Sequence, residues 1–77
     1  MKKKIDDIRA AINSLDDQIL DLLQKRSQLS VDMGRIKRSQ QQLVFDPARE
    51  EEIINRLDDR RQPPLTRPMV EGIFREI

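Results

Sequence analysis

Apolar residues recur with a regular spacing along the first half of the chain. Ten positions there follow an unbroken alternation of three- and four-residue steps, and nine of them are aliphatic or methionine. The positions are Ile5, Ile8, Ile12, Leu15, Ile19, Leu22, Arg26, Leu29, Met33 and Ile36. This period predicts one helix, from about Ile5 to Arg38, that packs lengthwise on a partner. Arg26 is the exception, a cation at a position where the pattern otherwise excludes water.

Two shorter helices are predicted in the second half. Asp46 followed by Pro47 is typical of a helix start, so the second helix should run from about Pro47 to Arg60. The turn Arg61-Gln62-Pro63-Pro64 should end it. The inward side of this helix is predicted to carry Glu50, Ile53, Ile54 and Leu57. Thr66 is the expected N-cap of a third helix, whose apolar face comprises Val70, Ile73, Phe74 and Ile77.

The length of the first helix predicts how the chain assembles. At ~1.5 Å per residue this helix is about 50 Å long, so two helices of roughly 14 and 12 residues cannot cover its stripe. We therefore expect an all-α fold of one long and two shorter helices in an intertwined homodimer. Residues 1–77 should form a single domain, with a disordered basic tail at residues 1–4. The third helix stops in mid-pattern, so the natural chain is expected to continue past Ile77.

Composition narrows the chemistry. The chain has no cysteine and no histidine, which excludes disulfides, thiol nucleophiles, imidazole bases and nearly all zinc or haem sites. We expect neither a metal nor a cofactor. Fifteen basic against fourteen acidic residues, with two phenylalanines as the only aromatics, disfavour nucleic-acid binding. No apolar run approaches a membrane span, so a cytoplasmic protein is expected.

Three cations of the long helix are expected to meet. Lys37 lies eleven residues after Arg26 and so points within about 20° of the same direction. Arg9 flanks the stripe near the opposite end. If two long helices pair antiparallel, Arg9 of one chain approaches the region from Arg26 to Lys37 of the other. Each pocket would then contain residues of both protomers.

The start of the second helix adds Asp46, Arg49 and Glu50, whose carboxylates are predicted on the inward side. Four cations and two carboxylates suit a small dianionic ligand that also bears a hydroxyl group, because guanidinium groups bind carboxylates bidentately. Each residue alone also allows a structural interpretation. Arg26 could extend its charged end into water, or fix helix register by pairing with Asp32 or a partner glutamate. Lys37 could belong to a solvated patch, and Asp46 could act only as an N-cap.

Taken together, these residues resemble the all-helical class of chorismate mutases. The resemblance covers Ile5 to about Leu57 nearly continuously. It is carried by Ile8-Arg9, Ile12, Leu15-Asp16, Leu22-Leu23, Arg26, Gly34 to Lys37 and Asp46-Pro47-Ala48-Arg49-Glu50. It implies a homodimer with two equivalent, shared pockets that convert chorismate to prephenate by a [3,3] rearrangement.

The resemblance also implies a role for each matching position. Arg26, with Arg9 of the other protomer, would hold the two carboxylates of the substrate. Lys37 would hydrogen-bond the ether oxygen, and Arg49 would support a carboxylate or orient its neighbours. Asp46 and Glu50 would address the ring hydroxyl and the reacting face, which makes Lys37, Arg26 and Glu50 the candidate catalytic residues.

Other functions fit the same sequence. An isochorismate-pyruvate lyase has the same fold and a similar cationic pocket. A non-catalytic dimerisation module would use Arg26 only to specify pairing. Fusion to, or association with, another enzyme of aromatic amino-acid synthesis is a further expectation from the resemblance.

Overall fold

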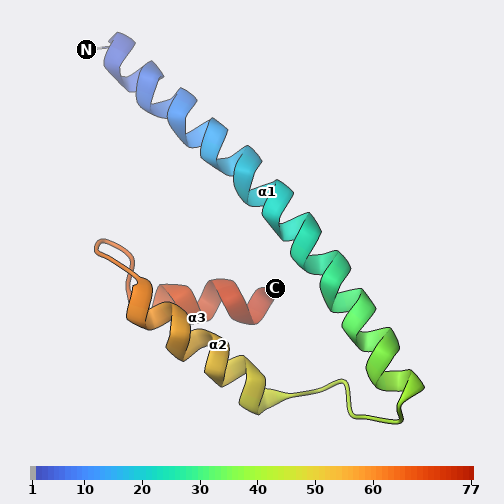
Figure 1. The fold of residues 1–77 in the computed structure, drawn as a ribbon. Coiled ribbons are helices and arrows are strands. Elements are labelled where there is room, and N and C mark those ends of the chain that lie inside the picture. The colour runs from blue at the N-terminus through green and yellow to red at the C-terminus, as the bar shows by residue number, and fades with distance from the viewer. Residues whose placement is uncertain (1) are drawn as a thin grey trace. The chain divides into compact units, whose positions relative to one another are not determined.

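The computed structural model describes residues 2–77, with side chains from Lys4 onward, and it is built of helices (Figure 1). Helix α1 spans Lys2–Ser39, α2 spans Pro47–Arg60 and α3 spans Arg67–Glu76. No strand occurs in the described range. The predicted all-α fold of one long and two shorter helices is therefore confirmed.

The chain divides into two compact units between Met33 and Gly34. Helix α1 crosses this boundary, while α2 and α3 both lie in the second unit. The expectation of a single domain stays a prediction. None of the described helices is long and apolar enough to cross a membrane.

Helix α1 begins earlier than its apolar stripe. It starts at Lys2 rather than Ile5 and ends at Ser39. Lysine is a good helix former, so the helix continues past the residues that need a packing partner. A disordered tail was predicted over residues 1–4. Met1 lies outside the described residues, whereas residues 2–4 belong to α1.

A Schellman motif closes the C-terminus of α1. The backbone N–H of Gln42 donates to the carbonyl of Lys37 at 2.7 Å, and that of Gln41 donates to Arg38 at 3.1 Å. Gln41 has a φ of 58°, the left-handed conformation that this motif requires and that glycine usually supplies. The motif satisfies terminal carbonyls of the helix and fixes where the chain leaves α1 beside Lys37.

Both predicted N-caps are confirmed. The carboxylate of Asp46 accepts a hydrogen bond from the backbone N–H of Arg49 at 3.0 Å, and Pro47 follows at the first helical position. The hydroxyl of Thr66 accepts from the backbone N–H of Met69 at 3.4 Å. Side-chain oxygens thus satisfy donors that the first turn of each helix leaves unpaired. Helix α2 has the predicted bounds, and the Pro63–Pro64 peptide bond in the turn after it is cis.

A small apolar core joins α2 to α3. Ile54 of α2 and Val70 of α3 are buried, with 1% and 3% of their surface exposed. Ile53, Leu57 and Phe74 are half-buried, as their predicted inward positions suggest. Ile73 was also placed on the inward face, but half of its surface is exposed. One helix packed on another covers only a narrow stripe, and Ile73 lies at its edge.

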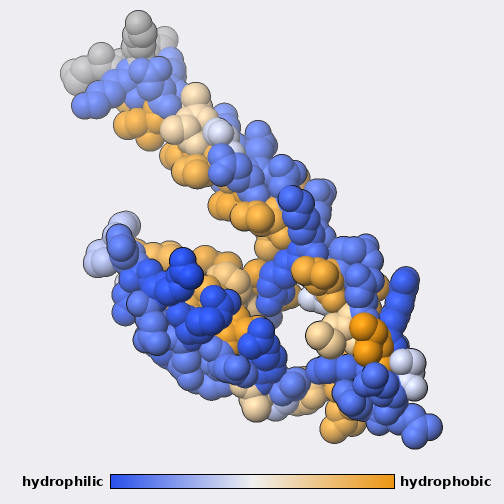
Figure 2. All heavy atoms as spheres, in the orientation of Figure 1, coloured by the Kyte–Doolittle hydropathy of each residue, from blue (hydrophilic) through white to orange (hydrophobic). Residues whose placement is uncertain are grey.

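The apolar stripe of α1 lies at the surface of the chain. Its nine apolar members are each 50% to 68% exposed. Figure 2 shows apolar residues following one another along α1. A contiguous apolar surface of this length is typical of a surface that binds another protein.

Candidate functional site

Two candidate residues from different helices form an ion pair. Lys37 lies in the last turn of α1 and Asp46 caps the first turn of α2. The Nζ of Lys37 is 3.8 Å from Oδ2 of Asp46, while Oδ1 of Asp46 accepts the capping hydrogen bond from Arg49. The cap and the Schellman motif therefore fix both ends of the loop that brings this pair together.

The surroundings of Lys37 suit a role in anion binding. Its side chain is 19% exposed, against 46% for Asp46. A distance of 3.8 Å is longer than a charge-assisted hydrogen bond, so the ammonium group retains donors for a ligand. Low exposure also strengthens the attraction between the ammonium group and an anion, because less water screens the two charges.

Arg49 and Glu50 point to different partners. Arg49 pairs with Glu52 on the exposed side of α2, with Nη1 3.5 Å from Oε1. Glu50 is half-buried on the inward side, as predicted, and its Oε1 is 3.6 Å from Nε of Arg75 in α3. Arg49 and Glu50 therefore contact different residues and do not pair with each other in these contacts. Both residues remain candidates for the site.

Arg9 and Arg26 lie on the part of α1 that precedes Met33. Arg9 is exposed and Arg26 is half-buried. Asp32, the alternative partner considered for Arg26, accepts a hydrogen bond from Nε2 of Gln28 at 3.0 Å. The predicted meeting of Arg9 with Arg26 requires a second copy of the chain and stays a prediction.

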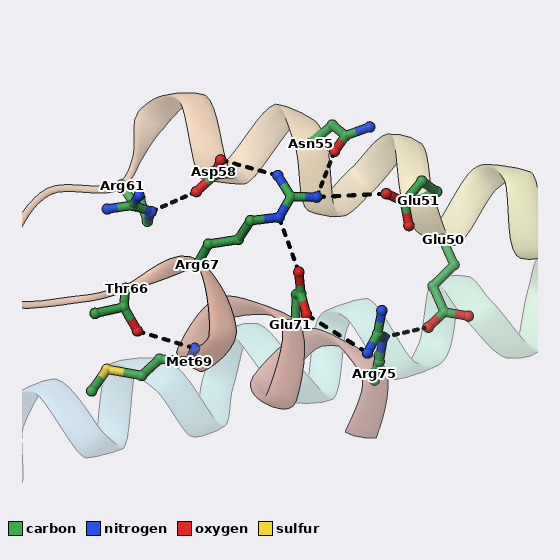
Figure 3. A network of polar contacts seen from close by, with 10 residues as sticks. All are labelled: Glu50, Glu51, Asn55, Asp58, Arg61, Thr66, Arg67, Met69, Glu71 and Arg75. Carbon is green, nitrogen blue, oxygen red and sulfur yellow. Dashed lines mark hydrogen bonds and ion pairs between the residues drawn. The ribbon is translucent and has the colours of Figure 1, made fainter.

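An extensive polar network joins α2 to α3, and sequence reasoning missed it. Its centre is Arg67, the first residue of α3 (Figure 3). The guanidinium of Arg67 donates to Asp58 at 3.0 Å, Asn55 at 2.8 Å and Glu71 at 2.9 Å, and lies 3.5 Å from Glu51. Three of these four partners belong to α2, so one side chain fixes the start of α3 on the neighbouring helix.

The network changes the acidity of its members. The pKa of Asp58 lies below its usual value of 3.8, mainly because Arg61 donates a hydrogen bond to its carboxylate. Partial burial opposes this shift, and a hydrogen bond from Arg67 adds to it. Hydrogen bonds to Asp58 and Glu71 raise the pKa of Arg67. Both groups are therefore charged over the physiological pH range.

Sequence patterns carried only part of the signal for this network. The i, i+4 spacing of Arg67 with Glu71 and of Glu71 with Arg75 is visible in the sequence and favours ion pairs on one helix. The contacts of Arg67 and Arg75 with α2 depend on how the two helices are placed against each other. That placement is not encoded in local spacing.

Among the residues that the structure describes, no group of three or more Asp or Glu side chains is arranged to hold a metal ion. A shallow depression on α1 is lined by Leu20, Leu23, Gln24, Ser27, Gln28 and Val31. None of the six candidate residues, all of them within the described range, lines this depression. The six candidate side chains, four cationic and two acidic, offer charge and hydrogen bonding.

A family model described as chorismate mutase type II matches residues 8–77. A bifunctional chorismate mutase/prephenate dehydratase from Stutzerimonas stutzeri is 28% identical over 75 residues, covering 91% of this chain and 20% of the relative. A protein of the same description from Neisseria gonorrhoeae is 33% identical over 81 residues, covering 100% of this chain and 22% of the relative. No solved structure matches significantly.

The chain spans about a fifth of the length of either curated relative. The family match covers residues 8–77 and includes all six candidate residues.

Proposed function

The chain belongs to the chorismate mutase type II family, and we propose that it converts chorismate to prephenate by a [3,3] rearrangement. The observation that carries this proposal is the family match over residues 8–77, which contains every charged residue assigned to the site. The names of both curated relatives support the same substrate.

The proposed active unit is a homodimer formed through α1. The exposed apolar stripe supports this arrangement, because leaving nine large apolar side chains half exposed forgoes on the order of 1 kcal/mol each. Antiparallel pairing of two α1 helices covers the stripe and carries Arg9 of one protomer toward Arg26 of the other. Their guanidinium groups then hold the two carboxylates of the substrate.

Lys37 acts on the ether oxygen in this proposal. Breaking the carbon–oxygen bond places negative charge on that oxygen, and a nearby ammonium group stabilises the transition state more than the ground state. The low exposure of Lys37 and its long contact with Asp46 support this role, since the ammonium group needs only a small movement to leave Asp46.

The start of α2 orients the ring of the substrate. Asp46 and Glu50 bind the ring hydroxyl and line the reacting face, and Arg49 supports a carboxylate or its neighbours. The N-cap of α2 holds Asp46 in place, and the half-buried position of Glu50 supports its assignment to the site.

The reaction matches the inventory of side chains. A pericyclic rearrangement needs no proton transfer and no covalent intermediate, so a chain without histidine or cysteine has the groups that it needs. Catalysis comes from holding a flexible diacid in a reactive conformation and from stabilising the charge that develops on the ether oxygen.

The test is an assay of the purified protein with chorismate, monitored by ultraviolet absorbance and product identification. We expect prephenate as the product. Lys37→Ala should lower kcat by about 10²- to 10³-fold, as removal of one preorganised donor does elsewhere. Lys25→Ala, an exposed lysine of the same helix, is the matched control and should leave kcat unchanged.

Two outcomes would contradict the proposal. Release of pyruvate from isochorismate without prephenate formation from chorismate would identify a lyase. Stable dimers that act on neither substrate would identify a dimerisation module.

We further propose that the domain works together with another enzyme of aromatic amino-acid synthesis in the cytoplasm. The curated relatives combine chorismate mutase with prephenate dehydratase by name, which supports a link to an enzyme that consumes prephenate.

A further inference from the structure

A row of alternating charges connects the centre of the α2–α3 network to a candidate site residue. It runs from Asp58 through Arg67, Glu71 and Arg75 to Glu50 (Figure 3). We propose that Arg75 is a positioning residue, which holds the carboxylate of Glu50 in the orientation that binds the substrate. This inference rests on the proposed function, because it assigns Glu50 to the site.

The contact between Arg75 and Glu50 bridges two helices. Glu50 lies in the first turn of α2 and Arg75 in the last turn of α3. Nε of Arg75 is 3.6 Å from Oε1 of Glu50, and the two side chains are 55% and 45% exposed. A glutamate side chain has three rotatable bonds, so an exposed one samples many orientations unless a partner restricts it. Arg75 is the partner that the structure provides.

Arg75 is itself restricted from the other side. Its Nη1 lies 3.7 Å from Oε2 of Glu71, one turn earlier in α3. The other oxygen of Glu71 accepts a hydrogen bond from Nε of Arg67 at 2.9 Å, and Glu71 is only 28% exposed. The planar guanidinium of Arg75 therefore lies between two carboxylates, and the less exposed one belongs to its own helix.

Arg67 fixes the position of α3 along α2. Burial of apolar residues such as Ile54 and Val70 is non-directional, so it resists sliding of one helix past the other only weakly. Hydrogen bonds from Arg67 to Asp58 and Asn55 have defined directions and supply that alignment. Through Glu71, the same alignment determines where Arg75 can reach Glu50.

The ion pair between Arg75 and Glu50 should affect catalytic activity more than folding stability. Ion pairs between side chains that are about half exposed contribute little to the free energy of folding, because water screens them. A misdirected Glu50, in contrast, loses its alignment with the bound substrate, and small errors in alignment lower the rate steeply.

The experiment is a double-mutant cycle measured by kcat/KM for chorismate. Arg75→Gln should lower kcat/KM by about tenfold in the wild-type background, as expected for a misaligned side chain. In the Glu50→Gln background the same change should alter kcat/KM by less than about twofold, because the group that Arg75 positions is already gone. Arg75→Lys keeps the charge and should recover part of the loss.

The matched control is Arg56→Gln, an exposed arginine on the outer side of α2. It should change kcat/KM by less than about twofold. Circular dichroism and thermal unfolding should show the helices of every variant intact. If Arg75→Gln fails to fold, Arg75→Lys carries the same cycle, with a smaller loss that again disappears in the Glu50→Gln background.

The outcomes separate the two claims. A wild-type protein without turnover of chorismate overturns the proposed function, and this inference with it. An active wild type in which Arg75→Gln matches Arg56→Gln overturns the inference alone. Equal losses from the Arg75 substitutions in both backgrounds would also overturn it, because Arg75 would then act independently of Glu50.

Discussion

Helix α1 and the pair of helices α2 and α3 differ in how far their apolar residues are buried within one chain. In the pair, Ile54 and Val70 are buried, and a network of charged side chains links the two helices. In α1, nine apolar residues of one stripe remain half exposed or more. The pair thus has a core within one chain, whereas α1 presents a surface that another molecule can cover.

The difference also divides the residues of the proposed site into two groups. Contacts inside one chain already determine the positions of Lys37, Asp46 and Glu50, through two helix caps and the α2–α3 network. The positions of Arg9 and Arg26 relative to a ligand depend on what packs against α1. The proposed site is therefore half preformed in the monomer and half dependent on association.

The largest expected effect comes from placing a charge in the α1 stripe. Ile12→Asp buries an unpaired carboxylate in the proposed dimer interface, which costs about 3 to 5 kcal/mol and raises the dissociation constant at least ~10²-fold. Ser14→Asp introduces the same charge on the opposite side of the helix and should leave the dimer intact. Sedimentation measurements give the dimer dissociation constant of each variant. Equal dissociation constants for the two variants would contradict an interface along the stripe.

Arg26→Leu separates a binding role from a structural one. Leucine completes the apolar stripe, so the dimer should be as stable as the wild type or more so. Turnover should nevertheless fall by at least about 10²- to 10³-fold, because the proposed site loses a cation that would hold the substrate. Arg35→Leu, an exposed arginine of α1, serves as the control. Retention of most activity by Arg26→Leu would remove Arg26 from the site.

Ile54→Ala tests the core of the α2–α3 pair. Truncating this buried side chain should lower the free energy of unfolding by about 2 to 3 kcal/mol. Leu43→Ala removes a similar side chain that is 85% exposed, and it should change stability by less than about 0.5 kcal/mol. Urea unfolding monitored by circular dichroism measures both. Equal effects would mean that Ile54 is not a core residue in solution.

Lowering the pH should destabilise the packing of α2 against α3, because the carboxylate of Asp58 becomes protonated. Because the pKa of Asp58 is lower in the folded chain than its usual 3.8, the folded state favours the ionised carboxylate. The resulting stabilisation is fully present above pH 3.8 and is lost as the pH falls through the lowered pKa of the folded state.

Measuring the thermal unfolding temperature as the pH falls from above 3.8 to below it tests whether Asp58 causes this loss of stability. Asp58→Asn should reduce the pH dependence of the unfolding temperature, whereas substitution of the exposed neighbour Asp59 by Asn should not. An unchanged pH dependence in Asp58→Asn would show that other carboxylates cause the acid sensitivity.

Local sequence signals predicted the elements well. Asp46-Pro47 and Thr66 marked helix starts correctly because N-capping depends only on residues within one turn. The spacing of apolar residues predicted α1 because a helix repeats its faces at a fixed period. The end of α1 was harder to predict in detail, since the left-handed residue there is Gln41 rather than glycine.

Contacts between elements were predicted less well. The sequence placed Lys37, Asp46 and Glu50 among the candidates, but it did not indicate that Lys37 would pair with Asp46 or that Glu50 would pair with Arg75. Such pairs depend on loop geometry and on the alignment of two helices, which arise from many weak contacts together. The approach of Arg9 to Arg26 is harder still to predict from the sequence, because it depends on a second chain.

We propose that each active site contains residues from two copies of the chain. Arg9→Ala and Lys37→Ala should each be nearly inactive, because every site in either homodimer lacks one essential cation. If the two variants are mixed, unfolded and refolded together, half of the dimers should be mixed, with one intact site each. The mixture should then regain about a quarter of wild-type activity. A mixture as inactive as its components, with mixed dimers demonstrated by mass, would contradict the claim.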